Sequence, residues 1–240
     1  MEGSFKVDHY SRHELKEDKV AEGAVQAAAW VSANRTKVVI PAIVVLLVAA
    51  IAGGLVGWYQ LNNKSASVVL GRAFATYNAP LASEARPGVE NYPTDQDRLY
   101  AAKKAFYAVS DAYPHTKAGQ AAHFMAATIE LELGNNQIAE DQLKSVAAHA
   151  GRDYSSMANL SLASLYHATG RDAEALELYK KLADHPSAAV SKVSAQLAQA
   201  DMLAATSPDQ ARKLYEQIAK DNAKTDLEEL AKSKSEALGK

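Results

Sequence analysis

Hydrophobic positions follow two patterns along the chain, one continuous and one periodic. The continuous pattern is residues 38–59, which read VVIPAIVVLLVAAIAGGLVGWY and carry no charge over 22 residues. At about 1.5 Å per residue, a helix of this length spans roughly 33 Å, which exceeds a hydrocarbon core of about 30 Å. The run therefore predicts a transmembrane helix, which we assign to residues 38–60. Trp58 and Tyr59, at its end, are residue types typical of the membrane–water interface.

The segment before this run, residues 1–37, combines six basic and six acidic residues with apolar positions at helical spacing. This pattern predicts a short amphipathic helix on the cytoplasmic surface of the membrane. The length of the segment and of the apolar run favours an uncleaved anchor over a signal peptide. Arg35 and Lys37 precede the run closely, whereas Lys64 and Arg72 follow it. This slight bias predicts a cytoplasmic N-terminus and a C-terminal part outside the cytoplasm.

Gly53 and Gly57 form a Gly-x-x-x-Gly spacing within the apolar run. That spacing lets two transmembrane helices approach closely, so these glycines are the candidate residues for a helix–helix contact in the membrane. Small residues are also common in transmembrane helices that make no such contact. The sequence leaves both interpretations open.

The periodic pattern occupies the rest of the chain and recurs about every 36 residues. Ala102, Ala139, Ala175 and Ala211 are separated by 37, 36 and 36 residues. An aromatic residue or Leu stands four positions after each Ala, and a further aliphatic residue stands three positions after that. Equally periodic stretches lie between these segments and end in short polar turns. We therefore predict a series of helix pairs, in which each pair buries its apolar face against its neighbours.

One unit of this series has the spacing of the tetratricopeptide repeat. At the positions of that pattern stand Leu162–Ala163, Tyr166, Gly170, Ala175 and Tyr179. Neighbouring units match less closely, since Glu130 stands where an aromatic residue is expected. The fold class predicted is all-α: a single N-terminal transmembrane helix followed by a tetratricopeptide-like α-solenoid, a right-handed superhelix of helix pairs with a C-terminal capping helix.

Prolines and charges indicate where the array begins and ends. Val68–Leu81 is expected to form the first helix of an incomplete pair, followed by a proline-containing loop over Ser83–Asp97. We therefore assign the incomplete pair and its loop to residues 61–97, and the repeats with their cap to residues 98–240. In the cap, apolar residues are expected to share one face of a charged final helix: Leu227, Leu230, Ala231 and Leu238.

The first helix of each pair is expected to line the concave side of the solenoid. Inward positions of these helices are mostly apolar and carry few charges. The candidate partner-binding residues are Phe124, Thr128, Leu131, Met157, Leu160, Ser164, His167, Gln196 and Leu203. Such a groove suits extended or helical protein segments. The alternative is that a neighbouring helix, the cap or a second copy covers the same side chains.

Composition and motifs exclude several classes of function. The chain has no Cys, which excludes disulfides, thiolate metal sites and cysteine nucleophiles. Its formal charge is −2 and its basic residues form no stripe, so nucleic-acid binding is not expected. The sequence lacks the common motifs of hydrolases, metalloproteases and nucleotide-binding enzymes, and its seven His are scattered. We therefore predict a non-enzymatic protein without a metal ion or cofactor.

The segment Ala24–Lys64 resembles the ancillary SecYEG translocon subunit family of bacterial inner membranes. It contains an aromatic-bearing amphipathic helix that ends in Asn34–Arg35, a Lys before the apolar run, and Gly57–Trp58 at its exit. The resemblance implies an inner-membrane protein with a periplasmic repeat domain. Such a domain works beside the translocon, with a periplasmic chaperone, on emerging secreted chains. The resemblance implies no catalytic residue.

Two functions are compatible with these patterns. The first is a membrane-anchored interaction scaffold, which binds protein partners in an apolar repeat groove and assists the biogenesis of secreted or membrane proteins. The second is a structural or assembly scaffold of a bacterial envelope complex, a homo-oligomer that associates through the array and through Gly53 and Gly57. The oligomeric state of the protein distinguishes them.

Overall fold

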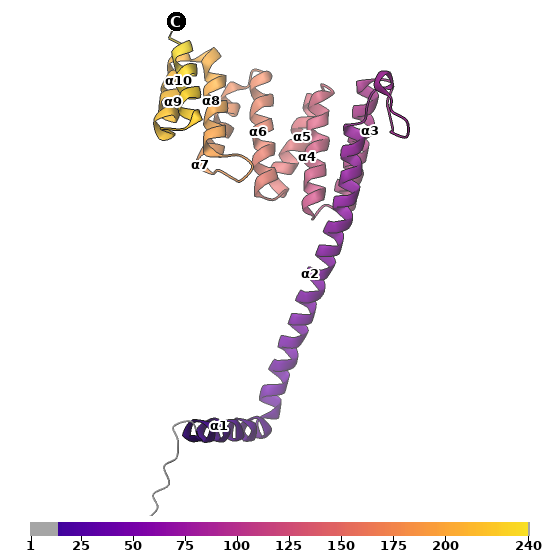
Figure 1. Ribbon diagram of the computed structural model, residues 1–240, viewed down its shortest axis with the longest axis vertical. Coiled ribbons are helices and arrows are strands. Elements are labelled where there is room, and N and C mark those ends of the chain that lie inside the picture. Colours follow the sequence, from indigo (N-terminus) through magenta and orange to yellow (C-terminus); the bar gives the residue numbers. More distant parts are fainter. Residues whose placement is uncertain (1–13, 240) are drawn as a thin grey trace, which may run out of the picture. The chain divides into compact units, whose positions relative to one another are not determined.

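The computed structural model describes residues 14–239, which form helices joined by short connections (Figure 1). Residues 1–13 of the predicted cytoplasmic segment lie outside the described residues. No strand occurs in the described range, where Leu81 and Tyr92 form an isolated β-bridge. The predicted all-α fold class is confirmed. The α-helices of this range are α1 (Glu14–Ala33), α2 (Arg35–Tyr77), α3 (Asp95–Ala112), α4 (Lys117–Glu132), α5 (Asn136–His149), α6 (Arg152–Ala168), α7 (Asp172–Asp184), α8 (Lys192–Thr206), α9 (Pro208–Asp221) and α10 (Asp226–Ala237).

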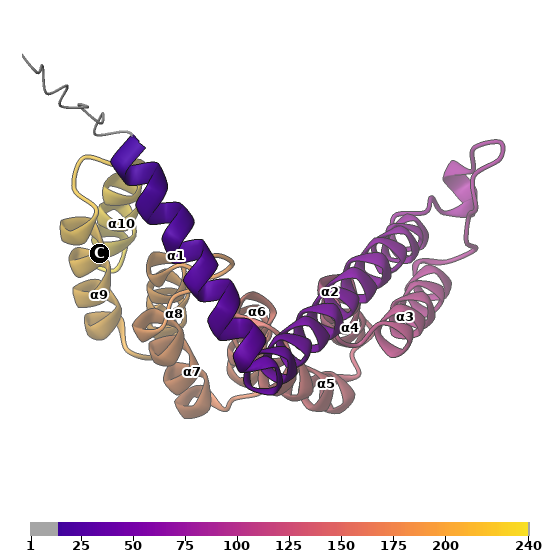
Figure 2. The same cartoon turned by 90° about the horizontal axis from the view of Figure 1, so that it is seen from below.

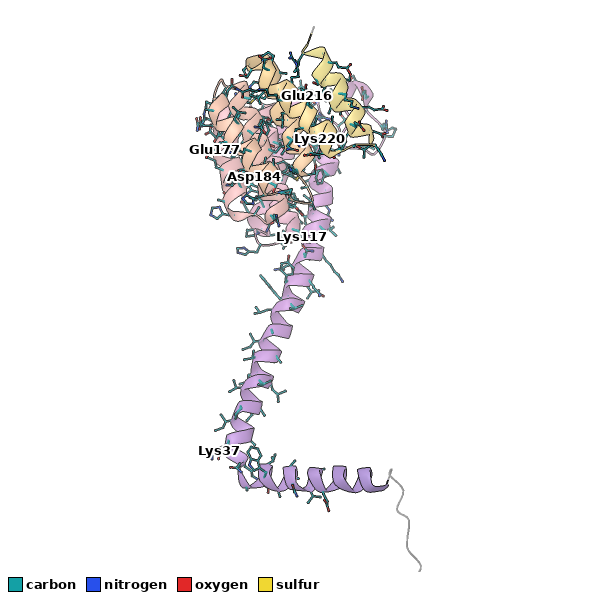
Figure 3. The ribbon with its side chains drawn as sticks, turned by 90° about the vertical axis from the view of Figure 1, so that its left-hand side faces the viewer. Lys37, Lys117, Glu177, Asp184, Glu216 and Lys220 are labelled. Carbon is teal, nitrogen blue, oxygen red and sulfur yellow. The ribbon has the colours of Figure 1, made fainter. Side chains whose placement is uncertain are left out.

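Residue contacts divide the chain into two compact units, Met1–Trp58 and Tyr59–Lys240. In the first unit, an 18-residue window of α2 has a mean hydropathy of 2.8, and none of it is buried. Figure 3 shows side chains projecting from this part of α2. Helix α2 is therefore long and apolar enough to cross a membrane.

Helix α2 continues past the end of the predicted membrane span. The sequence suggests a separate helix from Val68, yet α2 runs to Tyr77 without a break and contains 43 residues. No Pro stands between the apolar run and Tyr77, so nothing interrupts the helical hydrogen bonds. The last turns of α2 pack against α3, where the rings of Phe74 and Phe106 lie 5.0 Å apart between centroids. These last turns of α2 contain the helix expected from Val68, and they contact α3 through the two rings.

The connection between α2 and α3 was expected over Ser83–Asp97. It contains a 3₁₀ turn, η1 (Ala82–Glu84), and it ends at Thr94, slightly earlier than expected. The side-chain oxygen of Thr94 accepts a hydrogen bond from the backbone N–H of Asp97 at 3.1 Å. This contact satisfies one of the free N–H groups of the first turn and fixes the start of α3.

From α3 onward, each helix packs against the next helix in the chain. Figure 2 shows α4, α6 and α8 on the inner side of this array, with α3, α5, α7 and α9 on its outer side. Gly134 and Gly170 end the inner helices α4 and α6, and both have a φ of 77°. Glycine adopts this left-handed conformation at no steric cost, so the chain turns at the same place in successive repeats.

The positions that recur in the sequence form the core of the array. The outer helices α3, α5, α7 and α9 each contribute three of them, spaced as Ala, aromatic or Leu, and aliphatic. All twelve side chains are at most 4% exposed: Ala102, Phe106, Val109, Ala139, Leu143, Val146, Ala175, Tyr179, Leu182, Ala211, Tyr215 and Ile218. The repeat prediction is therefore confirmed at each of its defining positions.

Apolar clusters shared by consecutive helix pairs run through the array. One cluster joins the end of α2 with α3 and α4 around Phe106 and Ile129. Another joins helices α4 to α8 and contains the small residues Ala163 and Ala175, both fully buried. Small side chains at these positions let helices α6 and α7 approach closely. Each pair thus depends on its neighbours for the burial of its apolar face.

Helix α10 closes the end of the array as predicted. Ala231 is fully buried, and Leu238 packs against the cluster that contains Tyr215. The guanidinium of Arg212 donates a hydrogen bond to the carbonyl oxygen of Leu238 at 2.9 Å. The expectation for Leu230 was wrong, because this residue is 44% exposed. Adjacent residues of a helix point about 100° apart, and with Ala231 turned into the array Leu230 lies at the edge of the buried face.

Candidate partner-binding surfaces

The residues predicted to form the groove lie on α4, α6 and α8, the inner helices of the array (Figure 2). Among the apolar members, Phe124 and Leu203 are only 8% and 5% exposed and belong to the core. Leu131, Met157 and Leu160 are half-buried and pack against core clusters with part of their surface open. These three residues therefore supply the accessible apolar surface of the predicted groove.

The polar members of the predicted groove are partly engaged within the array. The hydroxyl of Thr128 donates to the carbonyl oxygen of Met125 at 2.9 Å. The hydroxyl oxygen of Ser164 lies 3.3 Å from that of Tyr179, which joins α6 to α7. His167 Nδ1 lies 2.7 Å from a carboxylate oxygen of Asp172. Gln196 is half-buried on α8. Hydrogen bonding within the array therefore fixes several of these side chains in place.

Two clefts lie elsewhere, between consecutive outer helices. The α5–α7 cleft has a volume of about 460 Å³ and is lined by Lys144, Ala147, Ala148, Arg152, Ser155, Ser156, Asn159, Leu162, Tyr166, Leu178, Lys181, Leu182 and His185. The α3–α5 cleft has a volume of about 730 Å³ and is lined by Tyr107, Ser110, Asp111, Pro114, His115, Gly119, Gln120, His123, Gln142, Ser145, Val146, His149 and Ala150. None of the residues predicted for the groove lines either cleft.

The two clefts are repeat-equivalent positions of the array. A shift of 36 residues carries His123, Ser145 and His149 of the α3–α5 cleft onto Asn159, Lys181 and His185 of the α5–α7 cleft. Helix α5 lines both clefts, but with different residues facing each of them. These clefts were not predicted, because the candidate binding residues were chosen only among the inward positions of the inner helices. One signal in the sequence could have indicated the α5–α7 cleft: the change from the uncharged Ser145 to the charged Lys181 at equivalent positions of successive repeats.

A polar network beside the α5–α7 cleft joins successive outer helices. Glu140 on α5 is 8% exposed, and its carboxylate accepts hydrogen bonds from Lys144 and Arg171, both at 2.7 Å. The hydroxyl of Tyr166 donates to the same carboxylate at 3.3 Å, and the Arg171 guanidinium stacks 3.9 Å from the centre of the Tyr166 ring. Arg171 also forms two hydrogen bonds with Glu174. The network thus satisfies a charge that would otherwise be buried alone.

These contacts predict a pH dependence of stability. Hydrogen bonds from Lys144 and Arg171 lower the pKa of Glu140 below its usual value. A carboxylate with a lowered pKa stabilises the fold above the pKa of the unfolded chain, near 4.3, and this contribution disappears as the pH falls through the lower folded-state value. We expect Glu140→Gln to melt at a lower temperature than the wild type at neutral pH, with the difference shrinking below about pH 4. Thermal unfolding measured across this pH range tests it, and a constant difference would contradict it.

Comparison with known proteins identifies the family. The profile of the family described as "Tetratricopeptide repeat-like domain" matches residues 29–240. The chain belongs to the tetratricopeptide repeat-like family. No curated protein and no solved structure gives a significant match. Tetratricopeptide repeat-like domains generally mediate protein–protein interactions. Within the described residues, no group of three or more His, Asp or Glu is arranged to hold a metal ion.

Proposed function

We propose that this tetratricopeptide repeat-like protein is a single-pass inner-membrane scaffold, with a cytoplasmic N-terminus and a periplasmic array that binds protein partners without catalysing a reaction. The main observation behind the proposal is that one chain contains both an exposed apolar helix and an array of tetratricopeptide-like repeats. The exposed apolar window of α2 is stable in lipid and costly in water. Leu131, Met157 and Leu160 provide the apolar surface for partner segments.

A reporter fusion tests the proposed orientation. Alkaline phosphatase and green fluorescent protein are fused separately to the C-terminus, after Lys240. A periplasmic array predicts active phosphatase and a dark fluorescent protein in cells, because the two reporters fold in opposite compartments. Moving the basic residues Arg35 and Lys37 to the other end of the apolar run is expected to reduce phosphatase activity. Strong fluorescence with inactive phosphatase in the wild type would contradict the orientation.

We further propose that the partners are the SecYEG translocon, a periplasmic chaperone and emerging secreted chains. The support is the resemblance of Ala24–Lys64 to the ancillary translocon subunit family, together with an array suited to protein segments. A photo-crosslinking residue at Leu160 or Ser164 is expected to capture these partners in growing cells. The same probe at Glu216, on outer helix α9, serves as the control. Equal capture at Leu160 and Glu216 would contradict binding at the inner surface.

Self-association is the second candidate function, favoured by one observation. A Cβ atom built on Gly53 or Gly57 has nothing within 4 Å, and both glycines lie in the exposed apolar part of α2. That surface is free to pack against the same helix of a second copy. Sedimentation of the full chain in detergent is expected to show a dimer that Gly53→Ile and Gly57→Ile disrupt. A monomer in the wild type would contradict this function and leave the first proposal intact.

A further inference from the structure

The α5–α7 cleft carries positive charge on three sides. Lys144 comes from α5, Arg152 from the first turn of α6, and Lys181 from α7, while the lining includes no carboxylate. His185 lies at the end of the same cleft. Lys144 is paired with Glu140 at 2.7 Å. The Arg152 guanidinium donates to the carbonyl oxygen of Pro186 at 2.8 Å, a neutral acceptor that does not offset its charge.

The architecture of the array does not require a cation at the position of Lys181. One repeat earlier, Ser145 occupies the position of Lys181, and one repeat later Gln217 occupies it. Asp221 likewise occupies, in the following repeat, the position of His185. The helices of these repeats pack in the same order, with the same buried Ala and aromatic-or-Leu positions. The charge of Lys181 is therefore a property of this cleft and not of the fold.

Apolar and hydrogen-bonding groups accompany the charges. Leu178 lines the cleft and is half-buried, so part of its surface is open, whereas the lining residues Leu162 and Leu182 are 3% and 4% exposed and belong to the core. Asn159 also lines it; its amide nitrogen donates to the backbone oxygen of Ser155, which leaves the amide oxygen free to accept a hydrogen bond. A phosphate or a free carboxylate has no N–H to offer such an acceptor, whereas a peptide backbone has one at nearly every residue.

From this combination we propose that the α5–α7 cleft binds an acidic peptide segment of a protein partner, with its carboxylates beside Arg152 and Lys181 and an apolar side chain against Leu178. Charge complementarity identifies the occupant, because exposed cations with no carboxylate among the lining residues attract acidic segments and repel basic ones. The site is separate from the inner surface and gives the scaffold a second, chemically distinct binding face. Its failure would leave the proposed membrane-anchored scaffold unaffected.

Fluorescence anisotropy of the full chain in neutral detergent tests the proposal, with a labelled peptide that alternates Glu and Leu as the probe. A peptide that alternates Gln and Leu has the same apolar content and controls for uptake into micelles. We expect the acidic peptide to bind more tightly than the neutral one. Because a charge reversal replaces attraction with repulsion, Lys181→Glu is expected to weaken acidic-peptide binding about five- to tenfold. The neighbouring Lys180 is exposed and does not line the cleft, so Lys180→Glu is the matched control and is expected to keep the affinity.

Three outcomes would overturn the assignment. Equal binding of the two peptides would show that the carboxylates are not recognised. Equal weakening by Lys180→Glu and Lys181→Glu would show attraction by the overall charge of the molecule. A third result would assign the cleft to a lipid headgroup: the wild type binds phosphatidylglycerol vesicles but not the acidic peptide, and Lys181→Glu no longer binds the vesicles. Thermal unfolding of each variant is measured alongside, and both substitutions lie at exposed positions that leave the core intact.

Discussion

Phe106→Ala is expected to lower the free energy of unfolding of the array by about 3–5 kcal/mol. The Phe106 side chain is fully buried, and its ring meets those of Phe74 and Tyr77 at centroid distances of 5.0 and 6.4 Å. Alanine would remove these aromatic contacts and leave a cavity where α2, α3 and α4 meet, because surrounding helices relax only partly. Urea denaturation of the full chain in detergent, followed by circular dichroism, measures the loss.

Tyr100→Ala is the matched control for this substitution. Tyr100 lies on the same helix, but it is 47% exposed, so its truncation removes less buried surface. We expect Tyr100→Ala to cost less than about 1 kcal/mol. A similar loss of stability in the two variants would show that the cluster around Phe106 does not hold the first pair of the array together.

Gly119→Ala is expected to destabilise the array by about 2–3 kcal/mol, the effect of forcing extra volume into a packed site. A Cβ atom at residue 119 would stand 1.9 Å from the backbone oxygen of Tyr113, and backbone cannot move aside as a flexible side chain can. The same turn is fixed by Thr116, whose hydroxyl oxygen accepts from the N–H of Gly119 at 3.0 Å. Thermal unfolding of the full chain in detergent provides the measurement.

Gly71→Ala gives the opposite expectation and serves as the comparison. Gly71 lies inside helix α2, and a Cβ atom there has nothing within 4 Å. Alanine restricts the unfolded chain and favours helix, so a gain of about 0.5–1 kcal/mol is expected. If Gly71→Ala and Gly119→Ala changed the stability in the same direction, close backbone packing at Gly119 would not be the reason for its effect.

The repeat architecture is largely predictable from the sequence because its determinants are local and recur. Ala175 must be small where helices cross, and Tyr179 must fill the space between pairs, so the same residue types return at each period. Gly170 ends its helix in a conformation that other residues rarely adopt. Such constraints are visible without knowledge of distant contacts.

The features that escaped prediction depend on contacts or on the absence of a signal. The length of α2 was missed because the end of the apolar run was taken as the end of the helix. The sequence between that run and Tyr77 has no signal that shows whether the helix stops or continues. Leu230 was placed on the buried face of the final helix by its helical spacing, but α10 packs with Ala231 inward and leaves Leu230 44% exposed. The α5–α7 cleft was missed because Arg152 and Lys181 are far apart in sequence and line the same cleft only when α6 and α7 pack together.

Because helix α5 lines its two neighbouring clefts with different residues, the charge and polarity of one cleft can differ from those of the other. Gln142, Ser145 and His149 face one side, while Lys144 and Ala148 face the other. A substitution of Ser145 thus changes the α3–α5 cleft and leaves the α5–α7 cleft unchanged. It also leaves unchanged the buried alanines and aromatic residues that hold the helices together. The binding specificity of each cleft on the outer surface can therefore change separately, while the packed core of the array stays the same.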